Sequence, residues 1–211
     1  MNPYSITIGR DFGSGGREIA RIIADRLDCQ FYDSEILALA AKESGFSEKL
    51  FAKHDEHHGR LHNLLFSKVP IIGHANYYSE QVTQGSLFRF QSEVIWHEAQ
   101  NHNCVFVGRG ADYVLRKHPN VLNIFIYADL DFKIRNVMQR TGLSDSEARR
   151  LILDTERTRA EYYNLYTGRQ WGDKSGYHLC INSAHFGITN TAEMLVEWIN
   201  SQINSTLYMS K

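Results

Sequence analysis

A short apolar segment, followed directly by a glycine-rich turn and an amphipathic segment, constrains this chain more than any other feature. Tyr4 to Ile8 is typical of a buried strand, and the turn Asp11-Phe12-Gly13-Ser14-Gly15-Gly16-Arg17-Glu18 follows it. Apolar side chains at 19, 22, 23 and 27 share one helical face, which predicts a helix from about Arg17 to Leu27. Glycines let backbone N–H groups approach an anion, and a helix start adds partial positive charge. The segment predicts a phosphate site with Arg17 as its cation; a glycine turn that only links strand to helix is the alternative.

The turn is a variant of the phosphate-binding consensus G-x-x-x-x-G-K-[ST]. Aligning Gly16-Arg17 with the Gly-Lys of the consensus places Asp11 at the first glycine and Glu18 at the Ser/Thr. Arginine can clamp phosphate oxygens bidentately, and a carboxylate can hold Mg²⁺ in place of the missing hydroxyl. The residues expected to bind phosphate are Gly13, Ser14, Gly15, Gly16, Arg17 and Glu18, with Glu18 also the candidate Mg²⁺ ligand.

Strand-like and helical patterns alternate along the rest of the chain. Strands are predicted at 29–32, 104–107, 121–128 and 178–182, and helices at 34–43, 85–100, 111–116, 131–140, after the capping box at 144–147, and at 189–203. This alternation predicts an α/β fold with a parallel, doubly wound sheet. Ligands bind beyond the carboxyl ends of such strands, so Gly9 to Arg17, Asp33 and Gly108-Arg109 should converge on one cleft.

Residues 44–102 have a different texture, being polar, rich in histidine and irregular around 69–86. We interpret this segment as a helical insertion on the acceptor side, of the kind that covers a substrate. The core of a single domain, residues 1–211, would then comprise 1–43 and 103–211.

Arginines at two glycine-flanked strand ends suggest two phosphate groups, with Arg17 holding a donor nucleotide and Arg109 an acceptor. The capped helix adds a third basic set, in which Arg150, Asp154 and Arg157 follow i, i+4, i+7 and Arg149 and Arg159 flank them. Arginines that close over the site would neutralise a moving phosphoryl group and exclude water. A solvated helix face with salt bridges is the alternative for this set.

Composition limits the class of partner. The 211 residues carry a net charge of -1, which gives no argument for nucleic acid or an anionic membrane. No apolar run approaches the roughly 18 residues of a membrane helix, and no signal peptide is visible. Three scattered cysteines without a Cys-x-x-Cys pair are typical of free thiols in a reducing compartment, so we expect a cytoplasmic protein, as a monomer or homodimer.

The chain resembles the cytidylate kinase-like proteins, a branch of the nucleoside monophosphate kinases of P-loop type. The resemblance is nearly full length. It is carried by Ile6 to Ile8, Phe12 to Ala20, Phe31 to Asp33, Gln91 to Leu115, Arg157 to Tyr163, Tyr166 to Gly168, Trp171 to Asp173 and Cys180 to Ser183.

The resemblance implies a five-stranded parallel core with a lid at about 142–175, ATP as donor with Mg²⁺, and a small phosphorylated acceptor such as CMP or dCMP. It also implies that Arg17, Arg157 and Arg159 are catalytic and that Asp33 and Arg109 bind the acceptor. Arg17 replaces the usual lysine, Glu18 the hydroxyl, and Gly110 the acid of the Gly-Arg-Asp motif. A nucleotide-binding protein without catalysis and a kinase with a non-nucleotide acceptor therefore remain alternatives.

Three further patterns have ordinary explanations. His54, His58 and His62 could bind zinc or form a solvated polar face. Aromatic side chains could stack a base or pack a lid hinge; they are Tyr162, Tyr163, Tyr166 and Trp171. Ser183 and His185 lack the glycine-framed turn of a hydrolase nucleophile, so we do not predict a triad.

Overall fold

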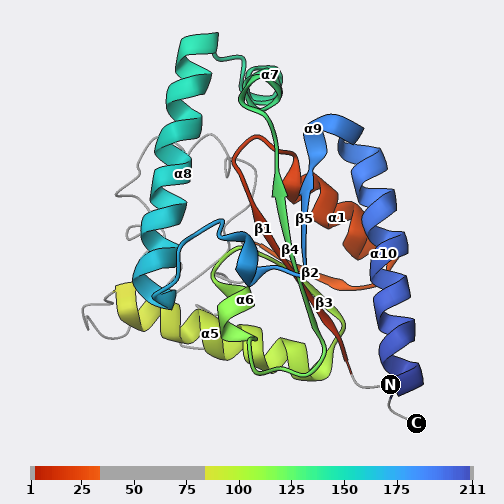
Figure 1. The fold of residues 1–211 in the computed structure, drawn as a ribbon. Coiled ribbons are helices and arrows are strands. Elements are labelled where there is room, and N and C mark those ends of the chain that lie inside the picture. Colours follow the sequence, from red (N-terminus) through yellow and green to blue (C-terminus); the bar gives the residue numbers. More distant parts are fainter. Residues whose placement is uncertain (1–2, 34–83, 210–211) are drawn as a thin grey trace, which may run out of the picture. The chain divides into compact units, whose positions relative to one another are not determined.

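The computed structural model describes residues 3–33 and 84–209 (Figure 1). The predicted helix at 34–43, most of the predicted insertion and the three candidate zinc-binding histidines lie outside the described residues. The chain divides into two compact units, Met1–Asp33 with Ile95–Lys211, and Ser34–Val94.

Five parallel strands form one sheet in the order β2-β3-β1-β4-β5. The strands are β1 Ser5–Arg10, β2 Gln30–Tyr32, β3 Cys104–Val107, β4 Val121–Tyr127 and β5 Leu179–Asn182. Ile6 lies opposite Val105 on one side and Leu122 on the other, so β1 occupies the centre of the sheet. The predicted parallel, doubly wound α/β fold is confirmed.

Helices follow most strands, as the alternation predicts. They are α1 Gly16–Arg26, α5 Gln84–Asn101, α6 Ala111–Val114, α7 Leu130–Thr141, α8 Asp145–Thr167, α9 Ser183–Phe186 and α10 Ile188–Met209. The capping box predicted at Ser144 and Glu147 opens α8. The short α9, which the sequence pattern did not predict, begins where Asn182 accepts a hydrogen bond from the backbone N–H of Ala184. Within the described ranges, none of these helices combines the length and apolar character needed to cross a membrane.

One face of the sheet packs against α1 and α10, which lie side by side (Figure 1). Alternate residues of β1 point to this face, and the α1 residues Ile19 and Ile23 pack with them against Leu195 and Ile199 of α10. All four side chains are at least 99% buried. Removal of this apolar stripe from water is the main stabilising contribution to the sandwich.

The segment that follows α8 packs on the opposite face. Gly9 points to this face, and a Cβ there would lie 2.6 Å from the Phe125 ring and 2.9 Å from the Tyr177 hydroxyl. The Trp171 ring meets Phe125 edge-on, with 5.7 Å between ring centroids. Packing of the chain after α8, the ordinary explanation offered for Trp171, is therefore what its contacts support.

Candidate functional site

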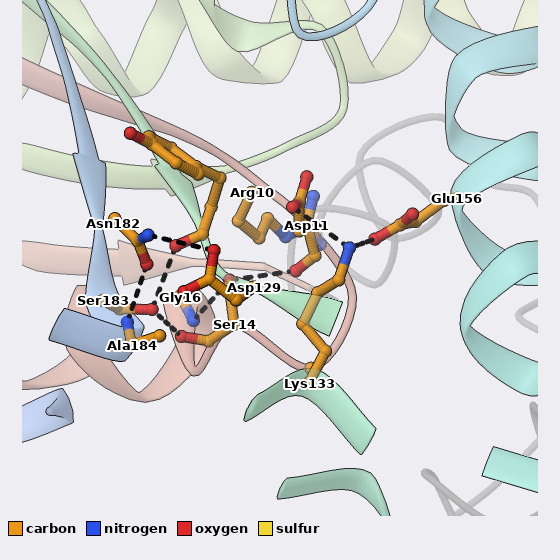
Figure 2. A network of polar contacts seen from close by, with 12 residues as sticks. Arg10, Asp11, Ser14, Gly16, Asp129, Lys133, Glu156, Asn182, Ser183 and Ala184 are labelled. Carbon is orange, nitrogen blue, oxygen red and sulfur yellow. Dashed lines mark hydrogen bonds and ion pairs between the residues drawn. The ribbon is translucent and has the colours of Figure 1, made fainter. Parts of the chain in front are cut away.

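The glycine-rich loop is held by its carbonyl groups. Ser14 Oγ donates to the Asp11 carbonyl at 3.0 Å, and Ser183 Oγ donates to the Ser14 carbonyl at 2.6 Å, as Figure 2 shows. From α7, Asn136 Nδ2 donates to the Gly13 carbonyl at 3.0 Å. These three hydrogen bonds tie the loop to itself, to α9 and to α7.

The N–H groups of the same loop are left available. Those of Gly13, Gly15 and Arg17 have no acceptor among the described residues. Gly13 and Gly15 have φ values of +86° and +76°, and a Cβ on Gly13 would lie 2.9 Å from the Lys133 carbonyl oxygen. Left-handed glycines that bring successive N–H groups together at a helix start form an anion-binding concavity. The arrangement can hold a phosphate chain.

Arg17 lies at this helix start, with its guanidinium turned toward the end of β2. Its Nε donates to Asp33 Oδ2 at 2.6 Å. The Arg17 side chain is 61% exposed, whereas that of Asp33 is only 14% exposed. The structure therefore brings together two predicted site residues that are 16 positions apart.

Arg10 lies within the segment Gly9 to Arg17 that was expected at the cleft, but sequence reasoning gave it no role of its own. It ends β1, and its guanidinium crosses the end of β3, where a Cβ on Gly108 would lie 2.1 Å from Nη1. Its Nη2 is 3.8 Å from Asp33 Oδ1, while its Nε is buried with no hydrogen-bond partner. Burial lowers the pKa of Arg10, the Asp33 carboxylate opposes this shift, and Arg109 and Arg17 lower the pKa further. The sequence signal for this role was an arginine two residues after the apolar segment that ends at Ile8.

Arg109 has a strained backbone. Its φ is +58°, between Gly108 at +73° and Gly110 at +67°. A left-handed residue other than glycine costs about 1–2 kcal/mol. Strain of this kind concentrates at functional sites, where the surrounding structure holds it in place. The Arg10 guanidinium lies against Gly108, the neighbour of Arg109 in this turn, and the charge of Arg109 lowers the pKa of Arg10.

Helix α8 contributes its arginines on two different sides. Arg159 Nη1 donates to the Arg10 carbonyl at 2.9 Å, and its guanidinium lies 5.4 Å from the centroid of the Phe12 ring. Burial, and then the charge of Arg10, lower the pKa of Arg159 well below its usual value. Arg157 is instead 69% exposed and pairs with Asp154 at 2.9 Å.

The remaining predicted arginines of α8 form ion pairs with exposed acids, as Arg157 does, and Arg149 also lies 3.9 Å from Asp131 of α7. Arg150 pairs with Asp154 at 3.7 Å, and Arg149 pairs with Asp145 at 3.0 Å. For these residues the contacts match the alternative of a solvated helix face. Among the described contacts of the predicted α8 arginines, those of Arg159 reach Arg10 and Phe12 at the loop.

A buried lysine explains the aspartate at the first position of the loop. Lys133 of α7 is 8% exposed, and its Nζ lies 3.3 Å from Asp11 Oδ2 and 2.7 Å from Glu156 Oε1 (Figure 2). Burial alone would lower the pKa of Lys133, but the two carboxylates outweigh it and raise the pKa. The triad ties the loop to α7 and α8. A lysine next to Ile134, within the buried stripe of α7, was the signal for it.

A polar cavity lies beside α6 and the segment after α8. It has a volume of about 360 Å³ and is lined by Tyr163, Arg169, Gln170, Asp173, Ser175 and Gly176. Tyr163 donates its hydroxyl to the buried carboxylate of Asp112 at 2.5 Å. Burial raises the pKa of Asp112, and the Tyr163 hydrogen bond opposes that shift. Sequence reasoning did not assign Asp112 or Arg169 to the site.

Within the described residues there is no group of three or more His, Cys, Asp or Glu side chains placed to hold a metal. Glu18 is exposed in the first turn of α1, so its oxygens are accessible to a hydrated Mg²⁺ beside the loop.

The Ser183 hydroxyl contacts two carbonyl groups, which gives it an anchoring role. Tyr162 and Tyr166 lie against each other with 4.9 Å between ring centroids.

The chain is similar to known proteins over most of its length. The model of the cytidylate kinase-like family matches residues 5–185. The cytidylate kinase of Thermococcus kodakarensis is 29% identical over 184 residues, which cover 86% of this chain and 80% of that relative.

Two solved structures show the same fold. An uncharacterized protein from Eubacterium ventriosum has a TM-score of 0.70 at 25% identity, covering 94% of this chain and 99% of that one. A gluconokinase from Sinorhizobium meliloti has a TM-score of 0.54 at 13% identity, covering 99% and 98% of the two chains, and this likeness concerns the fold alone.

Proposed function

The chain belongs to the cytidylate kinase-like family, and from this premise we propose that it is an ATP-dependent phosphotransferase acting on a nucleoside monophosphate such as CMP or dCMP. One observation carries the proposal. The open N–H groups of the loop lie next to a cluster of arginines contributed by β1, α1 and α8 together with Arg109. Phosphoryl transfer requires mainly positioning and neutralisation of charge, which are what such groups supply.

On the donor side, the loop residues 13–18 would bind the phosphates of ATP. Arg17 would take the place of the usual lysine once its guanidinium leaves Asp33, and its planar fork can contact two phosphate oxygens. Glu18 would hold Mg²⁺, which neutralises phosphate charge when bound.

On the acceptor side, Arg109 and Asp33 lie at the ends of neighbouring strands and would bind the monophosphate. An oxygen of its phosphate attacks the γ-phosphorus of ATP, a new P–O bond forms, and the bond to the bridging oxygen breaks so that ADP leaves. Arg159, already at the loop, would help to neutralise this charge. Arg157 would take part only after its ion pair with Asp154 opens.

The test is phosphoryl transfer from ATP and Mg²⁺ to a panel of nucleoside monophosphates, with ADP and the phosphorylated product both followed. We expect turnover on CMP or dCMP that is lost in Arg109→Ala and kept in Arg149→Ala, a surface arginine paired with Asp145. Absence of product with every monophosphate, despite ATP binding measured by calorimetry, would overturn the proposal.

One contact favours a second candidate, a nucleotide-binding protein without catalysis. Arg17 is held by Asp33 in the structure, and the loop has no lysine at that position. Sustained release of ADP that depends on the protein and on an identified acceptor would exclude this candidate. The panel should also include small hydroxyl compounds, because a kinase with a non-nucleotide acceptor would otherwise be mistaken for a protein without catalysis.

A further inference from the structure

Positive charge exceeds negative charge around the end of β1. Four cationic side chains, Arg10, Arg17, Arg159 and Lys133, share three carboxylates, those of Asp11, Asp33 and Glu156. Lys133 forms ion pairs with Asp11 and Glu156. The third carboxylate, that of Asp33, is shared by Arg10 and Arg17. Excess positive charge in a partly buried setting is costly unless an anion binds there.

Arg10 also has an unsatisfied donor. Its side chain is 17% exposed, yet its Nε–H group is buried and lacks an acceptor. More than 90% of buried backbone groups and most buried side-chain polar atoms find a partner, so an orphaned donor calls for an explanation. The exposed part of the guanidinium can still donate to a phosphate oxygen, and the bound anion would offset the excess charge.

The backbone is shaped around this guanidinium. Gly108 has a φ of +73°, and its missing Cβ leaves the space that Nη1 of Arg10 occupies. A side chain at position 108 would displace the guanidinium. The Gly-Arg-Gly turn therefore serves Arg10 as well as presenting Arg109.

The position of Arg10 in the sheet matches a ligand site. β1 and β3 are neighbours, and the chain leaves them toward α1 and α6, which lie on opposite faces of the sheet (Figure 1). Such a switch point is where ligands bind in doubly wound sheets. From β1, Arg10 extends toward Gly108 and Asp33, at the ends of β3 and β2, whereas the open N–H groups lie toward α1.

We propose that Arg10 binds the phosphate group of the acceptor and thereby selects phosphomonoesters over unphosphorylated hydroxyl compounds. This inference rests on the proposed kinase function and deepens it, because it names the residue that recognises the phosphate group of the acceptor. A phosphate group bound at Arg10 could belong to the acceptor or could be the γ-phosphate of ATP. The kinetic test below distinguishes these two sources.

The kinetic test compares Arg10→Met and Arg10→Lys with Arg26→Met. Arg26 is a control from the last turn of α1, 60% exposed and paired with Glu193. We expect Arg10→Met to raise the KM for the monophosphate by about 10- to 100-fold, the range for a lost charged hydrogen bond, while the KM for ATP stays within about threefold. Arg10→Lys should recover part of the loss because lysine keeps the charge without the fork. An unchanged acceptor KM, or an equal rise in both KM values, would overturn the inference.

A binding test separates this inference from the proposed function. Inorganic phosphate is titrated against the thermal unfolding midpoint, with a non-hydrolysable ATP analogue filling the donor loop. Phosphate should raise the midpoint of the wild-type chain and of Arg26→Met but not that of Arg10→Met. Without phosphate, Arg10→Met should unfold at the wild-type temperature or above it, since an unsatisfied cation is removed and Asp33 retains Arg17.

The two tests distinguish two failures. If no monophosphate is a substrate but phosphate protection depends on Arg10, the kinase proposal fails and the anion site stands. If turnover is normal and phosphate protects Arg10→Met fully, the kinase proposal stands and the role of Arg10 is wrong. Should Arg10→Met fail to fold, Arg10→Lys carries both measurements.

Discussion

Arg17 and Asp33 are joined by a 2.6 Å hydrogen bond from Nε to Oδ2, which links the first turn of α1 to the end of β2. The cation expected at the phosphate loop is therefore engaged by an acid expected on the acceptor side. Exchange of Asp33 for a phosphate would couple occupation of the donor loop to rearrangement of the acceptor side.

Replacing Arg17 tests its role directly. Arg17→Ala should lower kcat by about 10²–10³-fold, the usual cost of removing one group that stabilises transition-state charge. Arg26→Ala is the matched control, because Arg26 is on the same helix, is similarly exposed and forms an equally short ion pair. Steady-state kinetics with ATP and the best acceptor provide the measurement. Unchanged turnover in Arg17→Ala would remove Arg17 from the mechanism.

Loss of a loop anchor should weaken donor binding. Ser183→Ala removes the hydroxyl that contacts the Ser14 and Tyr127 carbonyl groups, so we expect a loss of about 1–2 kcal/mol in unfolding free energy and weaker ATP binding. Urea unfolding and calorimetry measure the two effects. Ser201→Ala is the control, since Ser201 makes a similar bond to a carbonyl on the exposed side of α10. ATP affinity equal to that of the control would show that the loop is rigid without Ser183.

The Asp112–Tyr163 pair predicts the direction in which stability changes when either side chain is replaced. Because burial raises the folded-state pKa of Asp112 above 3.8, its ionised form is penalised at neutral pH, and the penalty disappears as pH falls below the folded pKa. Asp112→Asn keeps an acceptor for the Tyr163 hydroxyl and should therefore match or exceed wild-type stability at pH 7. Tyr163→Phe removes the donor and should be less stable than wild type. Urea midpoints of the two variants in the opposite order would contradict this assignment.

Glu98 should contribute to the loss of unfolding free energy at low pH. Burial tends to raise its pKa, but hydrogen bonds from Tyr32, His97 and His102 outweigh burial and hold the pKa below 4.5. Since the folded-state pKa is depressed, the stabilisation is present above about pH 4.5 and is lost as pH falls through the folded pKa. Glu98→Gln should flatten the decline in unfolding free energy below pH 4.5. Identical slopes in the variant and wild type would refute this.

Much of the site was predictable from local sequence. The β1–loop–α1 unit, the two arginines at strand ends and the parallel sheet follow from apolar periodicity and glycine placement, because strand direction fixes which residues meet at one edge. Residues two apart on a helix point to different sides, so Arg157 and Arg159 could not both face the loop. Which of the two does so was not predictable, and the contact of one side of α8 with Arg10 and Phe12 decides it.

The sequence by itself determined the alternation of strands and helices and the position of the glycine-rich loop, since both depend on residues near one another in the chain. The tertiary structure alone decided which charges are buried together. Arg10 reaches Gly108 and Asp33, and Lys133 reaches Asp11 and Glu156, only because separate strands and helices bring them together. The energy of an electrostatic interaction depends on the distance between the charges and on their burial, and neither follows from the number of residues that separate them in the chain.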